Sequence, residues 1–267
     1  MSKELLRKPV GIENPKWLDK FYCQWQEEHP EIEAVIDQGV TDFAASEYLA
    51  WVKEGLRLTH FGIFLTQLAF PGPCSRVAYP PVSVREMDYI AITSVDDVRP
   101  VEIILGYQAL LQKENIYSDE GMAETICTAV EEYAHWVRGI LAWTDPQRVD
   151  RLRRESHGYD LARDNALATN AEVAELADMR WLREIATSRL TSDQIRWYLN
   201  DLVNRQTAAF TRFQATPEEY MAILWQMKVC KKFFPWSQMR VRLLEEHNQA
   251  YKYKLRSQRG RDSSTPV

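Results

Sequence analysis

The chain has 267 residues, of which 45% are hydrophobic and 27% are charged. This composition excludes a disordered protein, because enough apolar residues are present to bury a substantial core. The 38 acidic residues outnumber the 33 basic ones, which gives a formal net charge of −5. No run approaches the roughly eighteen apolar residues of a membrane span, and no apolar signal region follows Met1. We therefore expect a cytoplasmic protein with no membrane partner.

The spacing of the cysteines bears on whether the chain binds structural zinc or forms disulfide bonds. Four cysteines are present, and no two of them are spaced as a C-x-x-C pair. Neither a zinc knuckle nor a disulfide framework is therefore indicated. We expect all four to be reduced thiols in the core, namely Cys23, Cys74, Cys127 and Cys230.

The N-terminal quarter of the chain predicts two helices and a loop. A helix is expected over residues 15–28, because Asn14 is a capping residue and a proline occupies the first helical position. A long helix is expected within residues 41–70, where proline is absent and hydrophobic residues recur at helical spacing. Residues 71–81 contain four prolines, so they should form a loop or an extended connection.

The segment from Val84 to Val95 is the only one with clear strand character. Its side chains alternate, and β-branched and aromatic residues predominate. Two helices are expected after it, at about Arg99–Lys113 and Asp119–Trp143. The strand needs a partner, which is either a weaker strand in this chain or the same strand of a second copy across a dimer axis. The strand and two helices favour a ribbon–helix–helix unit.

The C-terminal half predicts helices throughout. The stretch from Gln147 to Thr216 contains no proline, and we expect helix starts at Asp145–Pro146, at Thr169–Asn170 and at Thr191, where Thr-x-x-Gln forms a capping box. Thr216 and Pro217 begin a further helix that should end near Phe234.

A last helix, at about Ser237–Arg256, is expected to lead into a polar disordered tail. The whole pattern predicts a mostly α-helical globule with one short strand. We divide it into an N-terminal part, residues 1–145, with the ribbon–helix–helix unit, an all-helical part, residues 146–256, and a tail, residues 257–267.

The charge of the chain changes sign near its C-terminal end. The segment from Lys228 to Arg261 carries a formal charge of +8, whereas residues 1–227 carry −12. This separation predicts a polyanionic partner, with nucleic acid preferred over a membrane. The alternative is a solvated helix whose basic face docks on the acidic body of the same chain. If the partner is double-stranded DNA, the phosphate contacts are expected from Lys228, Lys231, Lys232, Arg240, Arg242, Lys252, Lys254 and Arg256.

Aromatic residues are interleaved with these charges. Because aromatic rings can stack on bases or anchor a helix to the rest of the protein, they either extend the expected interface or hold it in place. The residues concerned are Phe233, Phe234, Trp236, Tyr251 and Tyr253.

The sequence contains one pattern that resembles a metal site. Glu132-x-x-His135 has the spacing of carboxylate-bridged sites in helical bundles, but such a site needs two of these motifs and two further glutamates. On a helical projection Glu131, Glu132 and His135 lie opposite the apolar stripe, so they are expected to face solvent. Asp96 and Asp97 are explained by the helix start expected after them.

No serine or cysteine has a histidine neighbour in a recognisable catalytic context, and no glycine-rich phosphate loop is present. We therefore expect no enzyme activity, catalytic residue, metal, cofactor or small-molecule substrate.

One further pattern points to a known family. The segment Arg99-Pro100-Val101-x-Ile103-Ile104-x-x-Tyr107-x-x-Leu110, together with Tyr48-x-x-Trp51 and Pro81-x-Ser83-Val84, resembles the AcaB-like transcriptional regulators of conjugative plasmids and integrative conjugative elements. The resemblance covers about residues 45–145. It implies an activator of transfer genes that binds duplex DNA as a homodimer, with contacts near the ribbon from Arg85, Thr93 and Arg99.

Two other classes of function stay open at this level. The nine tryptophans and twelve tyrosines would suit a helical adaptor that holds another protein. The Glu-x-x-His motif would suit a helical metal-dependent oxidase, which the single copy of the motif makes the weakest of the three hypotheses.

Overall fold

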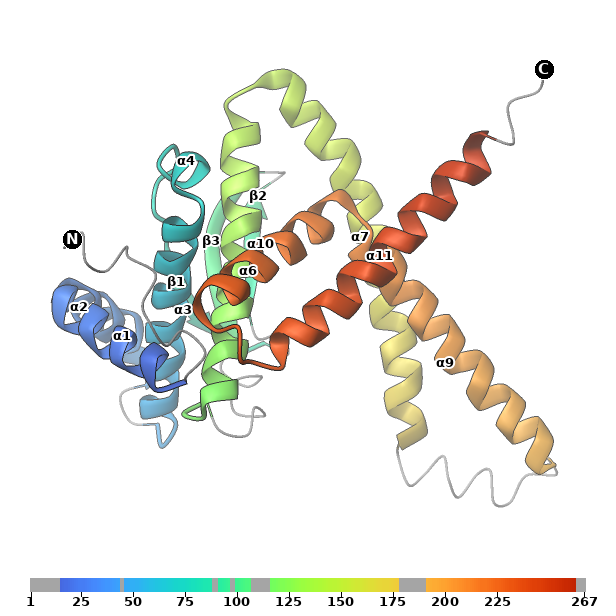
Figure 1. Cartoon of the computed structure of the whole chain (residues 1–267), viewed down its shortest axis with the longest axis horizontal. Helices are drawn as coiled ribbons and strands as arrows, with labels where there is room; N and C mark the ends of the chain where they lie inside the picture. The colour runs from blue at the N-terminus through green and yellow to red at the C-terminus, as the bar shows by residue number, and fades with distance from the viewer. Residues whose placement is uncertain are drawn as a thin grey trace. The chain divides into compact units, whose positions relative to one another are not determined.

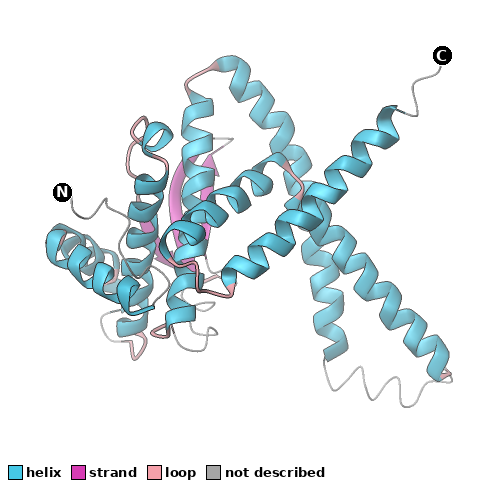
Figure 2. Ribbon diagram, viewed as in Figure 1, coloured by secondary structure: helices cyan, strands magenta, loops and turns pink. Residues whose placement is uncertain are grey.

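Helices make up most of the computed structural model, as the sequence predicts (Figures 1 and 2). The structure describes residues 15–43, 46–87, 91–96, 99–106, 116–177 and 191–262, without the side chains of 175–177 and 258–262. In chain order the elements are α1 Pro15–Glu28, α2 Pro30–Gly39, η1 Thr41–Phe43, α3 Leu49–Ala69, α4 Pro71–Cys74, β1 Val82–Arg85, β2 Ala91–Asp96, β3 Arg99–Gly106, α6 Asp119–Trp143, α7 Pro146–Ala177, α9 Ser192–Gln214, α10 Pro217–Phe233 and α11 Met239–Asp262.

The chain divides into two units that do not follow the predicted boundaries. The first unit is Met1–Leu152 with Met221–Glu245, and the second is Arg153–Tyr220 with Glu246–Val267. The sequence predicts a break near residue 145, which is close to the first boundary. It does not predict that most of α10 and the start of α11 return to the first unit, because that return depends on contacts between distant segments.

Helix α6 is the centre of the first unit. It packs against α3 and also against strands β2 and β3 (Figure 1). Both of the unit's hydrophobic clusters include residues of α6, such as Ile126 and Tyr133. The predicted bounds of this helix, Asp119 to Trp143, are confirmed, and the Ser118 side chain accepts a hydrogen bond from the Gly121 amide at its start.

A glycine sets the distance between α3 and α6. A Cβ atom placed on Gly62 would lie 2.7 Å from the Ala129 Cβ and 3.0 Å from the Ile126 carbonyl oxygen. The two helix backbones approach so closely at this point that no larger side chain fits without movement of one helix.

The single strand predicted over residues 84–95 is wrong in one respect, because the segment supplies two strands, β1 and β2, and both pair with a third strand of this chain, β3. The sheet has the order β1–β3–β2, with β1 parallel and β2 antiparallel to β3. The missing partner is therefore β3, the weaker strand that the sequence left open as one of two possibilities. Figure 2 shows this small sheet among the helices.

The helix predicted at Arg99–Lys113 is wrong over its first eight residues, which form β3. Val101, Ile103 and Ile104 are β-branched, and β3 is the central strand, hydrogen-bonded on both sides. Residues 107–113 lie outside the described part of the chain. With a strand in place of the first helix, the described residues do not form a ribbon–helix–helix unit.

The N-terminal helices confirm one local prediction and correct another. Helix α1 has the predicted bounds, and its Phe21, Tyr22 and Trp25 rings pack around Phe61 of α3. The connection at residues 71–81, expected to be non-helical, begins with the single helical turn α4. Pro71 occupies the first position of that turn, where the missing amide of proline costs nothing.

The second unit contains the rest of α7, α9, the first turn of α10 and most of α11. Tyr159 of α7 packs on Phe213 of α9, with ring centroids 5.3 Å apart, and Gln206 of α9 donates a hydrogen bond to Asn170 of α7. The capping box at Thr191 is confirmed. The helix start expected at Thr169 is wrong, because the Thr169 hydroxyl donates to carbonyls of its own helix and α7 continues to Ala177.

Two expectations about exposed segments also change. Helix α11 continues through Asp262, six residues into the tail that the composition predicts to be disordered, while residues 263–267 lie outside the described part. Cys23 is exposed, whereas the other three cysteines are buried as expected. None of the helices in the described ranges combines the length and the apolar content needed to cross a bilayer.

The close approach at Gly62 gives a stability prediction. We expect Gly62→Ala to lower the free energy of unfolding by about 1–3 kcal/mol, because the added methyl group must push α3 and α6 apart. Gly39→Ala is the control, since a Cβ at Gly39 meets no atom within 4 Å. Denaturant unfolding followed by far-ultraviolet circular dichroism measures both variants, and equal stabilities would contradict the prediction.

Candidate nucleic-acid interface

Three exposed lysines on α10 lie next to an aromatic pair in the first unit. The residues are Lys228, Lys231 and Lys232. Phe70, which directly follows α3, stacks on Trp225 of α10 with ring centroids 4.1 Å apart and planes at 11°. The Lys228 ammonium nitrogen lies 4.1 Å from the centroid of the Phe70 ring, within the range of a cation–π interaction.

Lys232 is held by neutral groups. Its ammonium group donates a hydrogen bond of 3.1 Å to the Leu68 carbonyl oxygen and lies 5.0 Å from the centroid of the Phe233 ring. Partial burial and the nearby positive charge of Lys228 both lower the pKa of Lys232. Among the described residues no carboxylate forms an ion pair with Lys228 or Lys232, and the two like charges repel each other.

The basic residues at the start of α11 differ from one another. Arg242 forms an ion pair with Glu124 of α6, at 3.3 Å, whereas Arg240 is exposed. A second glutamate of α6, Glu120, accepts hydrogen bonds from the Ser237 hydroxyl at 2.6 Å and from the Met239 amide at 3.1 Å. The first turn of α11 is thus attached to α6 by acidic side chains, and Arg242 belongs to that attachment.

The second unit carries its own group of cations on α11. Lys252 and Arg256 are exposed, and neither forms an ion pair with another described residue. The Lys254 ammonium lies 3.9 Å from the centroid of the Tyr220 ring, and partial burial lowers the pKa of Lys254. The Tyr220 hydroxyl is hydrogen-bonded to His247 Nε2 at 2.8 Å, which holds the ring beneath the lysine.

The residues expected near the ribbon have other contacts. Arg85 forms an ion pair with Glu102 of β3. The Thr93 hydroxyl lies 2.8 Å from both the Glu132 carbonyl oxygen and a Glu132 carboxylate oxygen, so Thr93 faces α6 and not a free surface. Arg99 is exposed, and its guanidinium carbon lies 6.0 Å from the centroid of the Trp143 ring. The structure does not bring these three residues together with the α10 lysines.

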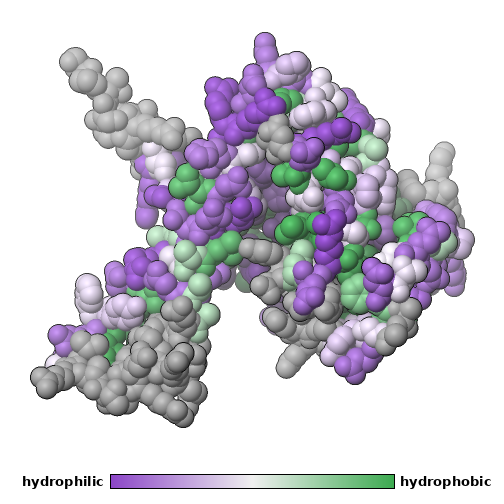
Figure 3. All heavy atoms as spheres, turned by 180° about the vertical axis from the view of Figure 1, so that it is seen from behind, coloured by the Kyte–Doolittle hydropathy of each residue, from purple (hydrophilic) through white to green (hydrophobic). Residues whose placement is uncertain are grey.

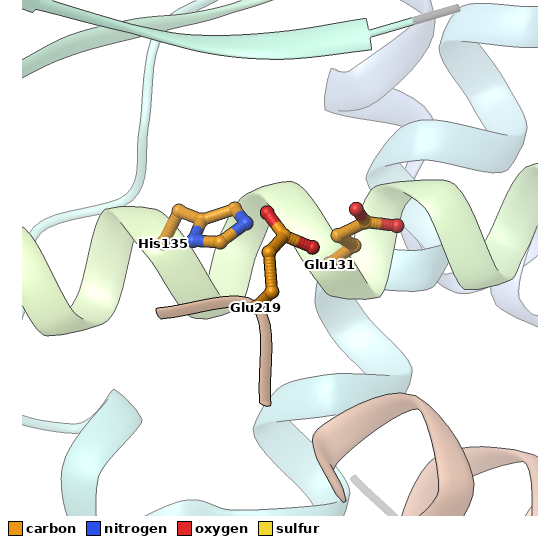
Figure 4. Close-up of side chains that lie close together, drawn as sticks. All are labelled: Glu131, His135 and Glu219. Atoms are coloured by element: carbon orange, nitrogen blue, oxygen red, sulfur yellow. The ribbon is translucent and has the colours of Figure 1, made fainter. Parts of the chain in front are cut away.

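The prediction that the polar face of α6 is open to solvent is wrong. Glu132 and His135 are buried and Glu131 is half-buried, because α6 has protein on the side opposite its apolar stripe as well. Glu132 accepts from Thr93 of β2, and Glu131 accepts from Gln226 of α10 at 2.8 Å. Figure 4 shows Glu131 and His135 about one turn apart on α6. The Glu131 and Glu132 carboxylates thus join this helix to its neighbours.

The first unit also contains a buried polar cluster without the features of a nucleophilic site. The Gln67 side chain donates to the Tyr133 hydroxyl at 3.2 Å, and Tyr133 in turn contacts the Cys74 thiol. Burial raises the pKa of Cys74 to about 11, so the thiol stays protonated near neutral pH. His60 Nδ1 lies 2.6 Å from the Tyr79 hydroxyl oxygen, and burial lowers the pKa of His60 to about 4.

Two residues of this candidate interface could not be identified from the sequence. Phe70 and Trp225 are 155 positions apart, and neither follows a pattern that marks it as a surface aromatic. Among the aromatics that the sequence did single out, Phe233 and Phe234 are buried in the core and cannot stack on bases. Tyr251 is exposed, whereas the Tyr253 hydroxyl accepts a hydrogen bond from Arg212.

Comparison with other proteins leaves the interface to be interpreted from its geometry. The chain matches no protein-family model, and no curated protein or solved structure is significantly similar to it.

The buried imidazole of His60 predicts how stability depends on pH. In the unfolded chain this group gains a proton near pH 6.5, whereas in the folded protein it does so only near pH 4. The unfolded state therefore binds more protons between these values, and we expect about 3 kcal/mol of stability to be lost as pH falls from 6.5 to 4.

The measurement is the free energy of unfolding against pH for the natural protein and for His60→Gln. The variant should lose less stability over this window. His157→Gln, which changes an exposed histidine, is the control and should keep the original slope. An unchanged slope in His60→Gln would show that other groups cause the acid sensitivity.

Proposed function

We propose that this protein binds double-stranded DNA and regulates transcription, with the α10 lysines as its main phosphate contacts. The observation that carries this proposal is the proximity of the Lys228 and Lys232 charges, neither of which forms an ion pair with a carboxylate in the part of the chain that the structure describes. A phosphate placed between two such ammonium groups removes their mutual repulsion and releases counterions from the DNA.

The acidic composition of the rest of the chain is compatible with this function. A protein with a net charge of −5 can bind DNA only through a localised surface, because its other surfaces repel the phosphates. The three α10 lysines supply such a surface in the first unit. The exposed Lys252 and Arg256 of α11 supply a second group of positive charges in the other unit.

The regulatory part of the proposal rests on the family resemblance. The AcaB-like regulators that residues 45–145 resemble act on genes of conjugative transfer, which would make control regions of such genes the target DNA. Phosphate contacts with lysine carry no base information by themselves, so the recognition of a particular site requires additional contacts.

A charge reversal on α10 tests the proposal. We expect the triple variant Lys228→Glu, Lys231→Glu, Lys232→Glu to bind a fluorescently labelled duplex at least about tenfold more weakly at low salt. Its slope of log affinity against log salt should be shallower by about three, roughly one for each lost phosphate contact. Fluorescence anisotropy over a range of salt concentrations measures both quantities.

The control for this experiment is Arg196→Glu, which reverses the charge of an exposed residue on α9. Each substitution in the triple variant changes the charge by the same amount. The Arg196→Glu protein should bind the duplex like the natural protein. Far-ultraviolet circular dichroism is used to check that the triple variant is folded. Undiminished binding by a folded triple variant would refute the α10 surface as the DNA contact.

A protein adaptor is the second candidate, and one observation favours it. Helix α9 carries large exposed hydrophobic side chains, with Trp197 70% exposed and Tyr198 and Phe210 also exposed. An adaptor would recover a protein partner from a cell extract independently of salt and of nuclease treatment. We expect Trp197→Ala to abolish that recovery if this function is correct, and a loss of recovery after nuclease treatment would favour the DNA-binding function.

A further inference from the structure

Helix α11 has a row of exposed hydrophobic side chains on one face. Val241 is 59% exposed, Leu244 48%, Tyr251 49% and Leu255 37%. Hydrophobic residues reach the surface of the molecule between hydrophilic ones, as Figure 3 shows for one side. Because the row lies along one continuous helix, its geometry follows from helical periodicity.

The spacing of this row is that of a coiled-coil seam. Starting from Val241, the four residues follow one another at intervals of three, seven and four positions, and Asn248 occupies the remaining place of the pattern. At 100° per residue the five side chains lie within roughly 80° of one another. The buried residues of α11 point the opposite way, namely Met239, Leu243 and Ala250.

The row is therefore a second apolar face and not an extension of the core. A helix that only covers a core needs one such face and exposes a polar surface on the other side. Two heptads are too short to hold an isolated coiled coil together. Because packing of its buried face already holds α11 in the helical state, pairing with a second helix does not have to supply the free energy of helix formation.

We propose that this face of α11 binds the same face of a second copy of the chain, with the two helices antiparallel. The order of charges along the helix selects this occupant. Glu245 directly follows Leu244 beside the row, and Lys252 directly follows Tyr251 on the same side. Antiparallel packing places Glu245 of each copy next to Lys252 of the other. The dimer therefore gains two ion pairs, each between a glutamate and a lysine.

The same arrangement suits the residues within the row. Leu244 of one copy packs against Leu255 of the other, and the Asn248 amide meets the Tyr251 hydroxyl, so both polar groups gain a hydrogen-bonding partner. A parallel pair would instead bring the two cationic C-terminal segments of α11 side by side. A homodimer is also what the DNA-binding proposal expects, but this surface does not depend on whether the chain binds DNA.

The oligomeric state in the absence of DNA tests the proposal. We expect light scattering coupled to size exclusion to give the mass of two chains at high micromolar concentration, falling to one chain on dilution. Leu244→Glu and Leu255→Glu should each raise the dissociation constant of the dimer at least about tenfold, a cost of roughly 1.4 kcal/mol. Leu161→Glu, which changes an exposed leucine of α7, is the matched control and should remain dimeric.

Cysteine cross-linking tests the orientation. In a Cys23→Ser background, a mixture of Leu244→Cys and Leu255→Cys proteins should form a disulfide between the two variants under mild oxidation. Each variant alone should form little cross-linked dimer. Efficient cross-linking of Leu244→Cys with itself would overturn the antiparallel arrangement, and a monomeric natural protein at all concentrations would overturn the interface. Neither result measures DNA binding, which the charge reversal on α10 tests separately.

Discussion

The close packing of α3 on α6 is the constraint on which the first unit depends. Gly62 lets the two backbones approach until only an alanine methyl fits between them. Helix α6 contacts α3 and also strands β2 and β3. A helix enclosed in this way keeps little of its surface in water, so the charged side chains that it buries need partners inside the protein. The hydrogen bonds from Thr93 to Glu132 and from Gln226 to Glu131 supply partners for these two carboxylates.

The structure separates charges that serve the fold from charges that are available to a ligand. Arg85 and Arg242 each have a carboxylate partner on a neighbouring element, and removing either arginine would leave a glutamate uncompensated. Lys228 and Lys232 of α10 instead contact aromatic rings, and Lys232 also donates to a backbone carbonyl oxygen. Those contacts orient the ammonium groups without neutralising them, so an external anion can still do so.

Helix α11 combines two roles along its length. Its buried face anchors it through Met239, Leu243 and Ala250, and its first turn is attached to Glu120. The opposite face carries the apolar row, while Lys252 and Arg256 remain exposed. Under our two proposals, one helix would therefore join two copies of the chain through the apolar row and the Glu245–Lys252 pairs, and Arg256 would add positive charge to the dimer.

The sequence by itself determined the local features of this protein. The bounds of α1 and α6, the capping box at Thr191 and the start of α10 were predictable, because capping residues, proline and apolar periodicity act within one or two turns. Only the tertiary structure decided that residues 99–106 form a strand, since their β-branched side chains suit a sheet only when two partner strands are present. Long-range packing likewise decided that Glu132 is buried and that Phe70 meets Trp225, because helical periodicity cannot reveal what covers each face of a helix.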